Sequence, residues 1–177
     1  MLEDAVRGPS FFVSVRAADI EELCGIHSQL QRHDRSLLNV GVLAEQLGQL
    51  KGLPHASPLR FLGYFAILES LLTHIPHPTD PYDSITRQIK KKLALLDRRF
   101  PRKIDYSPFG DVPPETVWTK MYNYRSQLAH GGTPQLGDKL QVLVSHDVAL
   151  TLVKETVKNV IRQALSEPQL LLDLREC

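Results

Sequence analysis

The sequence predicts an all-α fold, a bundle of five to six helices that follows a short extended N-terminal arm. Apolar residues recur at intervals of three and four along most of the chain, which is the spacing of a helix face. Proline and glycine separate these runs, and no alternating strand–helix pattern occurs. We therefore expect residues 1–16 to form the arm and residues 17–177 to form one helical domain.

The N-terminal part begins with an aromatic and apolar run at residues 9–16 that could be a strand or an extended arm. It is too isolated to build a sheet alone. From Ala17 to about Leu30 the pattern becomes helical, and Cys24 falls on the apolar face, so we expect Cys24 to be a small buried residue. A second helical run covers residues 37–50.

The next helix begins with Ser57 and Pro58, a capping hydroxyl followed by a proline at the first helical position. A broad apolar face continues to His74, and Glu69 is the one acidic residue in this run. Asp80, which also precedes a proline, predicts the start of a further helix.

This further helix extends to about residue 100 and is strongly basic. Residues 87–103 hold eight basic residues against one acidic residue, Asp97, although the formal net charge of the chain is only +1. Such a cluster is either an RNA-binding track or a solvated helix face. The residues that an RNA track would use are Arg87, Lys90, Lys91, Lys92, Arg98 and Arg99.

Two helices complete the bundle. Pro114 opens the first, whose apolar positions repeat at four, three and four before Gly131, a residue suited to a helix end. Ser145 or Asp147 can cap the last long helix, and a C-terminal piece at residues 167–174 follows it.

Arg125 and His130 lie in the last turns of the helix that Pro114 opens. Residues five apart differ by roughly 140° around a helix, so the two side chains do not share one face fully. Arginine is long, however, and both groups could converge on one phosphate, with a guanidinium to hold its oxygens and an imidazole to remove a proton from a 2′-hydroxyl. The alternative is that Arg125 pairs with a buried acid such as Glu69 while His130 only caps the helix.

Two segments of the chain carry a recognisable pattern, Phe65-Ala-Ile-Leu-Glu-Ser-Leu-Leu72 and Met121-Tyr-Asn-Tyr-Arg-Ser-Gln-Leu-Ala-His-Gly-Gly132. Together they resemble the HEPN superfamily, and the Apea-like HEPN group in particular. The similarity covers about residues 57–165, although only these two segments carry diagnostic residues. It implies an all-α bundle that commonly forms a homodimer with Arg-x4-6-His motifs at a shared cleft.

Many members of this superfamily are metal-independent endoribonucleases that leave a 2′,3′-cyclic phosphate and act in toxin–antitoxin or phage-defence (antiviral) systems. Others are catalytically inactive modules that bind RNA or protein. The resemblance assigns His130 as general base or acid and Arg125 as the phosphate clamp, with Ser126 as its polar neighbour. It gives Glu69 the role of orienting Arg125, with a purely structural ion pair as the alternative.

Tyr122 and Tyr124 could stack on an RNA base or belong to the core with anchored hydroxyls. His74-x-x-His77 lacks the partner ligands of a zinc site, so we expect no metal and no cofactor. The expected partners are RNA, a second copy of the chain, and an antitoxin or a larger defence system.

No stretch reaches the roughly 18 apolar residues of a membrane span, and the first residues lack the apolar segment of a secretory signal. The two cysteines, Cys24 and Cys177, have neither metal nor redox spacing. We therefore expect a cytoplasmic protein without a membrane partner.

Overall fold

The computed structural model describes residues 14–33, 38–76, 79–80, 83–132, 134 and 136–177. Over these ranges the chain forms seven α-helices and two short 3-10 helices, and none of the residues described lies in a strand. The prediction of an all-α fold is confirmed. The predicted arm falls mostly on residues 1–13, outside the described residues.

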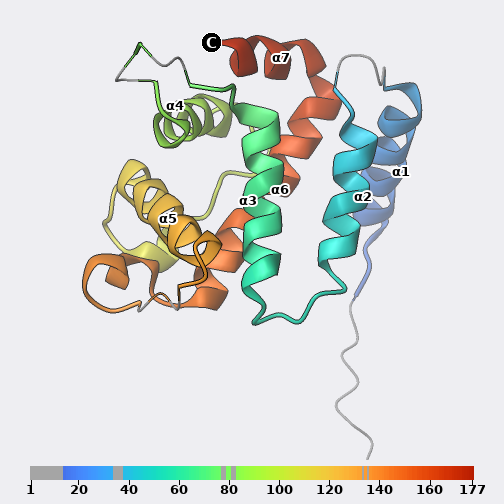
Figure 1. The fold of residues 1–177 in the computed structure, drawn as a ribbon. Helices are drawn as coiled ribbons and strands as arrows, with labels where there is room; N and C mark the ends of the chain where they lie inside the picture. Colours follow the sequence, from blue (N-terminus) through green and yellow to red (C-terminus); the bar gives the residue numbers. More distant parts are fainter. Residues whose placement is uncertain (1–13, 34–37, 77–78, 81–82, 133, 135) are drawn as a thin grey trace, which may run out of the picture.

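Of these seven α-helices, five pack around a central pair (Figure 1). The bounds of all seven are α1 Ala17–Arg32, α2 Val40–Leu50, α3 Pro58–Leu72, α4 Ile85–Asp97, α5 Pro114–Ala129, α6 His146–Ser166 and α7 Pro168–Glu176. Figure 1 shows α3 and α6 side by side at the centre, with α4 and α5 on one side, α1 and α2 on the other, and α7 across one end. The 3-10 helices are Ser107–Phe109 and Asp138–Leu143.

Helix α3 is the core element that positions the site. Seven of its fifteen residues are buried, and Phe61, Tyr64 and Phe65 have no exposed surface. A helix that is apolar on several sides must be surrounded, and α3 contacts α2, α4, α5, α6 and α7. Each buried aromatic side chain of this kind contributes about 1.5–3 kcal/mol through the surface that it removes from water.

The ends of the helices differ in part from the predictions. The predicted count of five to six helices is wrong, because Pro168 cannot continue α6 and the C-terminal piece forms the separate helix α7. Helix α4 begins at Ile85 rather than near Asp80, because the Ser84 hydroxyl caps its first turn. Ser145 caps α6 in the same way. Ser57 is the N-cap residue of α3, as expected, but its hydroxyl makes no capping hydrogen bond.

Helix α1 lies at the edge of the bundle and contains no buried residue. Its apolar side chains Ile20 and Leu23 are 54% and 63% exposed. Cys24 is exposed as well, so the prediction that it is buried is wrong. The periodicity of a sequence identifies an apolar face, but it does not say how much of that face another element covers.

Candidate functional site

Helix α5 ends in a tight turn that fixes the position of His130. The backbone N–H of Gly131 donates to the carbonyl of Leu128 at 3.1 Å, and that of Gly132 donates to the carbonyl of Gln127 at 3.0 Å. Gly131 has φ of 73°, so the pattern is a Schellman motif with glycine in the left-handed position. His130 is the C-cap residue, and it is exposed.

Arg125 lies one and a half turns earlier and contacts α3. Its Nη2 donates to Oε2 of Glu69 at 3.0 Å, and the two side chains are 31% and 17% exposed. No described residue accepts a hydrogen bond from the other nitrogens of the guanidinium, which therefore remain free to bind an anion. The predicted contact between Arg125 and Glu69 is present, and both roles considered for Glu69 depend on it.

Only one of the two carboxylate oxygens of Glu69 has a hydrogen-bond partner among the described residues. Its Oε1 is buried and has no hydrogen-bond partner among the described residues. An unsatisfied buried acceptor costs about 1–3 kcal/mol. The negative charge of Glu69 is therefore held beside Arg125 at an energetic cost.

The two tyrosines of the motif have different surroundings. Tyr122 is half-buried, with its ring edge-on to Phe65 at 6.3 Å between centroids, and the Arg125 Cζ lies 6.0 Å from the Tyr122 ring centroid. Tyr124 is buried, and its hydroxyl lies 2.8 Å from Nδ1 of His146. Burial raises the pKa of Tyr124. Tyr124 is thus a core residue with an anchored hydroxyl, while Tyr122 lies beside the guanidinium.

Two further residues complete the surroundings of the motif. Ser126 is half-buried, and its carbonyl accepts the backbone N–H of His130 at 3.2 Å. His146, the first residue of α6, was missed in the sequence, because nothing there relates it to a tyrosine 22 residues earlier. Its Nε2 is buried without a hydrogen-bond partner among the described residues.

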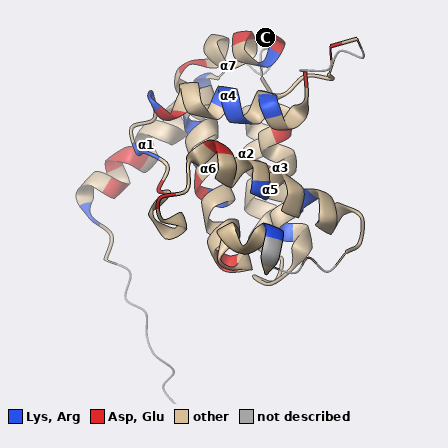
Figure 2. Ribbon diagram, turned by 90° about the vertical axis from the view of Figure 1, so that its left-hand side faces the viewer, with Lys and Arg blue, Asp and Glu red and all other residues tan. Residues whose placement is uncertain are grey.

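The six basic residues considered for RNA binding do not form one face. Figure 2 shows several Lys and Arg positions along α4. Lys91 and Arg98 are exposed, whereas Lys90 donates to the hydroxyl of Thr119 at 3.2 Å and Arg99 pairs with Glu167 at 2.7 Å.

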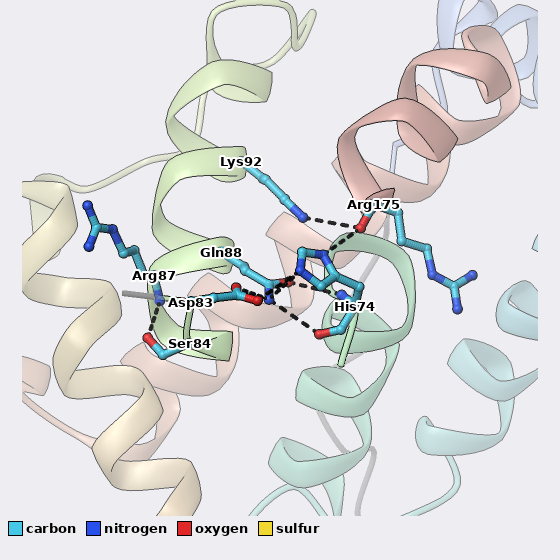
Figure 3. A network of polar contacts seen from close by, with 7 residues as sticks. All are labelled: His74, Asp83, Ser84, Arg87, Gln88, Lys92 and Arg175. Atoms are coloured by element: carbon cyan, nitrogen blue, oxygen red, sulfur yellow. Dashed lines mark hydrogen bonds and ion pairs between the residues drawn. The ribbon is translucent and has the colours of Figure 1, made fainter. Parts of the chain in front are cut away.

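Lys92 points toward the C-terminal helix and is only 4% exposed. Its Nζ lies 3.4 Å from the carbonyl oxygen of Arg175, and burial lowers its pKa (Figure 3). The exposed side chain of Arg87 lies on the other side of the same helix (Figure 3). An RNA track on α4 would therefore have to work without Lys92.

Lys92 belongs to a polar network that joins the ends of α3 and α7 to the start of α4 (Figure 3). The ring of His74 contacts Oδ2 of Asp83 at 3.1 Å and the carbonyl oxygen of Arg175 at 2.9 Å. Gln88 donates to Oδ1 of Asp83 at 2.7 Å and accepts the backbone N–H of His74 at 2.9 Å. This network could not be predicted from the sequence, because its members are up to 101 residues apart.

No group of three or more His, Cys, Asp or Glu side chains in the described ranges could hold a metal ion. None of the helices described is both long and apolar enough to cross a membrane. No protein-family model, no curated protein and no solved structure matches the chain.

Proposed function

We propose that the protein is a metal-independent endoribonuclease of HEPN type that acts at the C-terminal end of α5, in a toxin–antitoxin or phage-defence setting. The observation that carries this proposal is the pairing of a half-buried arginine, held by Glu69, with an exposed histidine on a fixed helix end. Arg125 has donors left for a phosphate, and His130 is accessible to a ribose hydroxyl. The two sequence segments that resemble the superfamily also support it.

The reaction needs a base, an acid and a clamp. His130, in its neutral form, would take the proton of a 2′-hydroxyl, and the 2′-oxygen would attack the adjacent phosphorus while the bond from phosphorus to the 5′-oxygen breaks. Arg125 would stabilise the charge that builds up on the phosphate oxygens. The 5′-oxygen must receive a proton, which His130 of a second copy would supply. The products are a 2′,3′-cyclic phosphate and a 5′-hydroxyl.

The decisive experiment compares the RNA cleavage of purified wild-type protein with that of His130→Ala and Arg125→Ala, in EDTA and without added metal. We expect each variant to lose about 10²–10⁴-fold in rate, the range for removal of a general acid–base group or a charge-stabilising donor. His27→Ala, at an exposed position of α1, is the matched control and should cleave like wild type. Intact RNA with the wild-type protein on structured and unstructured substrates would refute catalysis.

Glu69→Gln separates the two roles considered for Glu69. If Glu69 orients Arg125, the loss of the carboxylate charge should lower kcat while KM for RNA stays equal or falls, because the charge of the guanidinium is no longer compensated but its position is less fixed. If the pair is only structural, kcat should remain unchanged while the free energy of unfolding decreases. Both parameters come from one set of steady-state measurements with a short fluorescent RNA.

A second candidate is a non-catalytic module that binds RNA or protein. The observation that favours it is the number of cations already engaged, with Arg125 paired to Glu69, Arg99 paired to Glu167 and Lys92 buried. Such a module would bind RNA without cutting it, and Lys91→Ala and Arg98→Ala would weaken that binding. Cleavage that disappears with His130→Ala would decide against this alternative.

A further inference from the structure

Glu22 of α1 contacts two arginines that come from different parts of the bundle. Nη2 of Arg102, in the loop after α4, donates to Oε2 of Glu22, and Nη2 of Arg162, on α6, lies 3.2 Å from Oε1. The two guanidiniums thus hold one oxygen each of a single anion. No described residue accepts a hydrogen bond from their other nitrogens, so most of their donors remain free. Arginines bind the oxygens of a phosphate group in the same way.

The backbone that carries the two arginines is held in place without α1. The carbonyl of Arg102 accepts a hydrogen bond from Nδ2 of Asn159 at 3.0 Å, and Asn159, which is 8% exposed, lies one turn before Arg162 on α6. Further along the same loop, the backbone N–H of Ile104 donates to the carboxylate of Asp97 at 2.9 Å. A ligand would therefore meet both arginine side chains on a fixed backbone.

Helix α1 is held to the bundle far less firmly. It contains no buried residue, and its contact with the core consists of the half-buried side chains Ile26 and Leu30. Among the described residues, Glu22 is the one side chain of this helix that bonds to another element. Exposed ion pairs of this kind contribute little to stability. The helix can therefore leave its position at a low cost in free energy.

A cavity of about 490 Å³ lies between α1 and the rest of the bundle, next to this contact. Its lining includes Glu22, Gly25 and Ile26 of α1 on one side and Arg102, Arg162 and Gln163 on the other. The side chains of Arg102 and Arg162 are 63% and 31% exposed, so a ligand can reach both guanidiniums. Two positive charges face one negative charge here, and the other residues that line the cavity are uncharged. The site therefore favours an anion, and its volume is in the range of small-molecule sites.

We propose that Arg102 and Arg162 form a binding site for a phosphate group, and that Glu22 occupies this site in the unliganded protein. A phosphate monoester has close to two negative charges at neutral pH and three acceptor oxygens, so it can replace the carboxylate and engage donors that Glu22 leaves unused. Binding of the phosphate and seating of α1 then exclude each other, and the ligand releases the helix. The site is independent of the proposed RNA cleavage, because it shares no residue with Arg125, His130 or Glu69.

The test titrates the full chain with methyl phosphate and with dimethyl phosphate, which represent the terminal phosphate of a nucleotide and the diester of a nucleic-acid backbone. Binding is followed through the NMR signals of the arginine Nε–H groups. Release of α1 is followed through amide hydrogen exchange of residues 17–32, with α6 as the internal reference. We expect methyl phosphate, with its higher charge, to bind more tightly and to speed up exchange in α1 but not in α6.

Sodium chloride at equal ionic strength controls for screening, which also weakens ion pairs. Absence of binding by both phosphates, or an equal effect of chloride on the exchange of α1, would overturn the proposal.

Glu22→Gln removes the charge of the internal occupant and keeps its shape. It should lower the Kd of methyl phosphate by about two- to tenfold, the range for two exposed ion pairs, and should speed up exchange in α1 before any ligand is added. Glu21→Gln, at the neighbouring exposed position of α1, is the matched control and should leave both quantities unchanged. If Glu22 only attaches α1, exchange will rise while the Kd stays the same, and that result would refute the proposal.

Arg102→Gln and Arg162→Gln each remove one guanidinium and leave the buried core untouched. Each should raise the Kd of methyl phosphate by about fivefold or more, and the double variant should show no binding above that of chloride. Lys51→Gln, at an exposed position outside the cavity, removes the same charge and should bind like wild type. Equal weakening by Lys51→Gln would show that net charge attracts the phosphate and that the two arginines form no site.

Discussion

The contact with Glu69 has two opposite effects on the binding of a phosphate by Arg125. Its guanidinium is fixed by Glu69, which removes part of the entropy that a long side chain loses on binding. The same carboxylate compensates its charge and competes with a phosphate for Nη2. A phosphate can still reach the remaining nitrogens, so the pair favours orientation over strength of binding.

Tyr106 gives a prediction that depends on pH. Trp118 Nε1 donates to the hydroxyl oxygen of Tyr106 at 2.8 Å, and burial raises the pKa of Tyr106 to about 12. Since the unfolded tyrosine titrates near pH 10, the folded state holds its proton longer, and this contribution to stability is complete below pH 10 and is lost as the pH rises to about 12. We expect a loss of about 1–2 kcal/mol over this interval, because partial exposure reduces the effect.

The measurement is urea unfolding between pH 9 and 11.5, together with tyrosinate absorbance. In Tyr106→Phe the free energy of unfolding should decrease less steeply with pH than in wild type, whatever its absolute value. Parallel pH profiles for the two proteins would contradict the raised pKa of Tyr106.

For single residues, the sequence predicts those features that depend only on neighbouring positions in the chain. The glycine stop after His130 follows from the left-handed turn that only glycine adopts easily. The pairing of Arg125 with Glu69 was among the alternatives because Glu69 is the one acid on an apolar helix. The burial of Lys92 was not predictable, since it depends on a helix that begins 76 residues later in the chain.

Among the helices, α2 and α3 pack so closely at one point that a Cβ atom on α3 would require a side chain of α2 to move. A Cβ atom on Gly63 of α3 would lie 2.3 Å from Cδ2 of Leu50, whereas a Cβ on Gly48 of α2 would meet nothing within 4 Å. We therefore expect Gly63→Ala to lower the free energy of unfolding by about 1–2 kcal/mol through overpacking. Gly48→Ala should raise it by about 0.5–1 kcal/mol, because alanine favours the helix.

Chemical denaturation of both variants tests this pair. The double variant Gly63→Ala with Leu50→Ala should be more stable than the sum of the single effects predicts, because the second change removes the clash. Strict additivity, or a stabilising Gly63→Ala, would mean that Leu50 moves aside without cost.

The ends of the helices also differ in how well they can be predicted from a sequence. Hydroxyl caps at Ser84 and Ser145 follow from side-chain chemistry, yet the start of α4 was predicted at Asp80, and the structure places it after Ser84. Pro168 was a visible stop, but the short α7 after it gains its place from tertiary contacts, among them the bond between His74 and the carbonyl of Arg175. Contacts of this kind have no local signal.

At the scale of the molecule, the all-α class was predictable because the helical period runs through most of the chain. The arrangement around α3 and α6 was not, since periodicity does not say which faces meet. Helix α1 is the clearest case, because its apolar face predicts burial of Cys24 and the structure leaves that face largely exposed. The contact between Arg125 and Glu69 could be predicted as one of two alternatives, whereas its geometry required the fold.

The proposed reaction needs two proton transfers, whereas each chain contributes one motif histidine. The proposal therefore makes a prediction about assembly. If base and acid come from two copies, the protein must be a symmetric dimer with both His130 side chains at one cleft. Refolded equal mixtures of wild type and His130→Ala should then keep about one quarter of the wild-type cleavage rate, because only that share of random dimers has both histidines. Independent active sites would keep about one half. Analytical ultracentrifugation at the assay concentration is the companion measurement, and a monomer that cleaves RNA at full rate would refute the composite site.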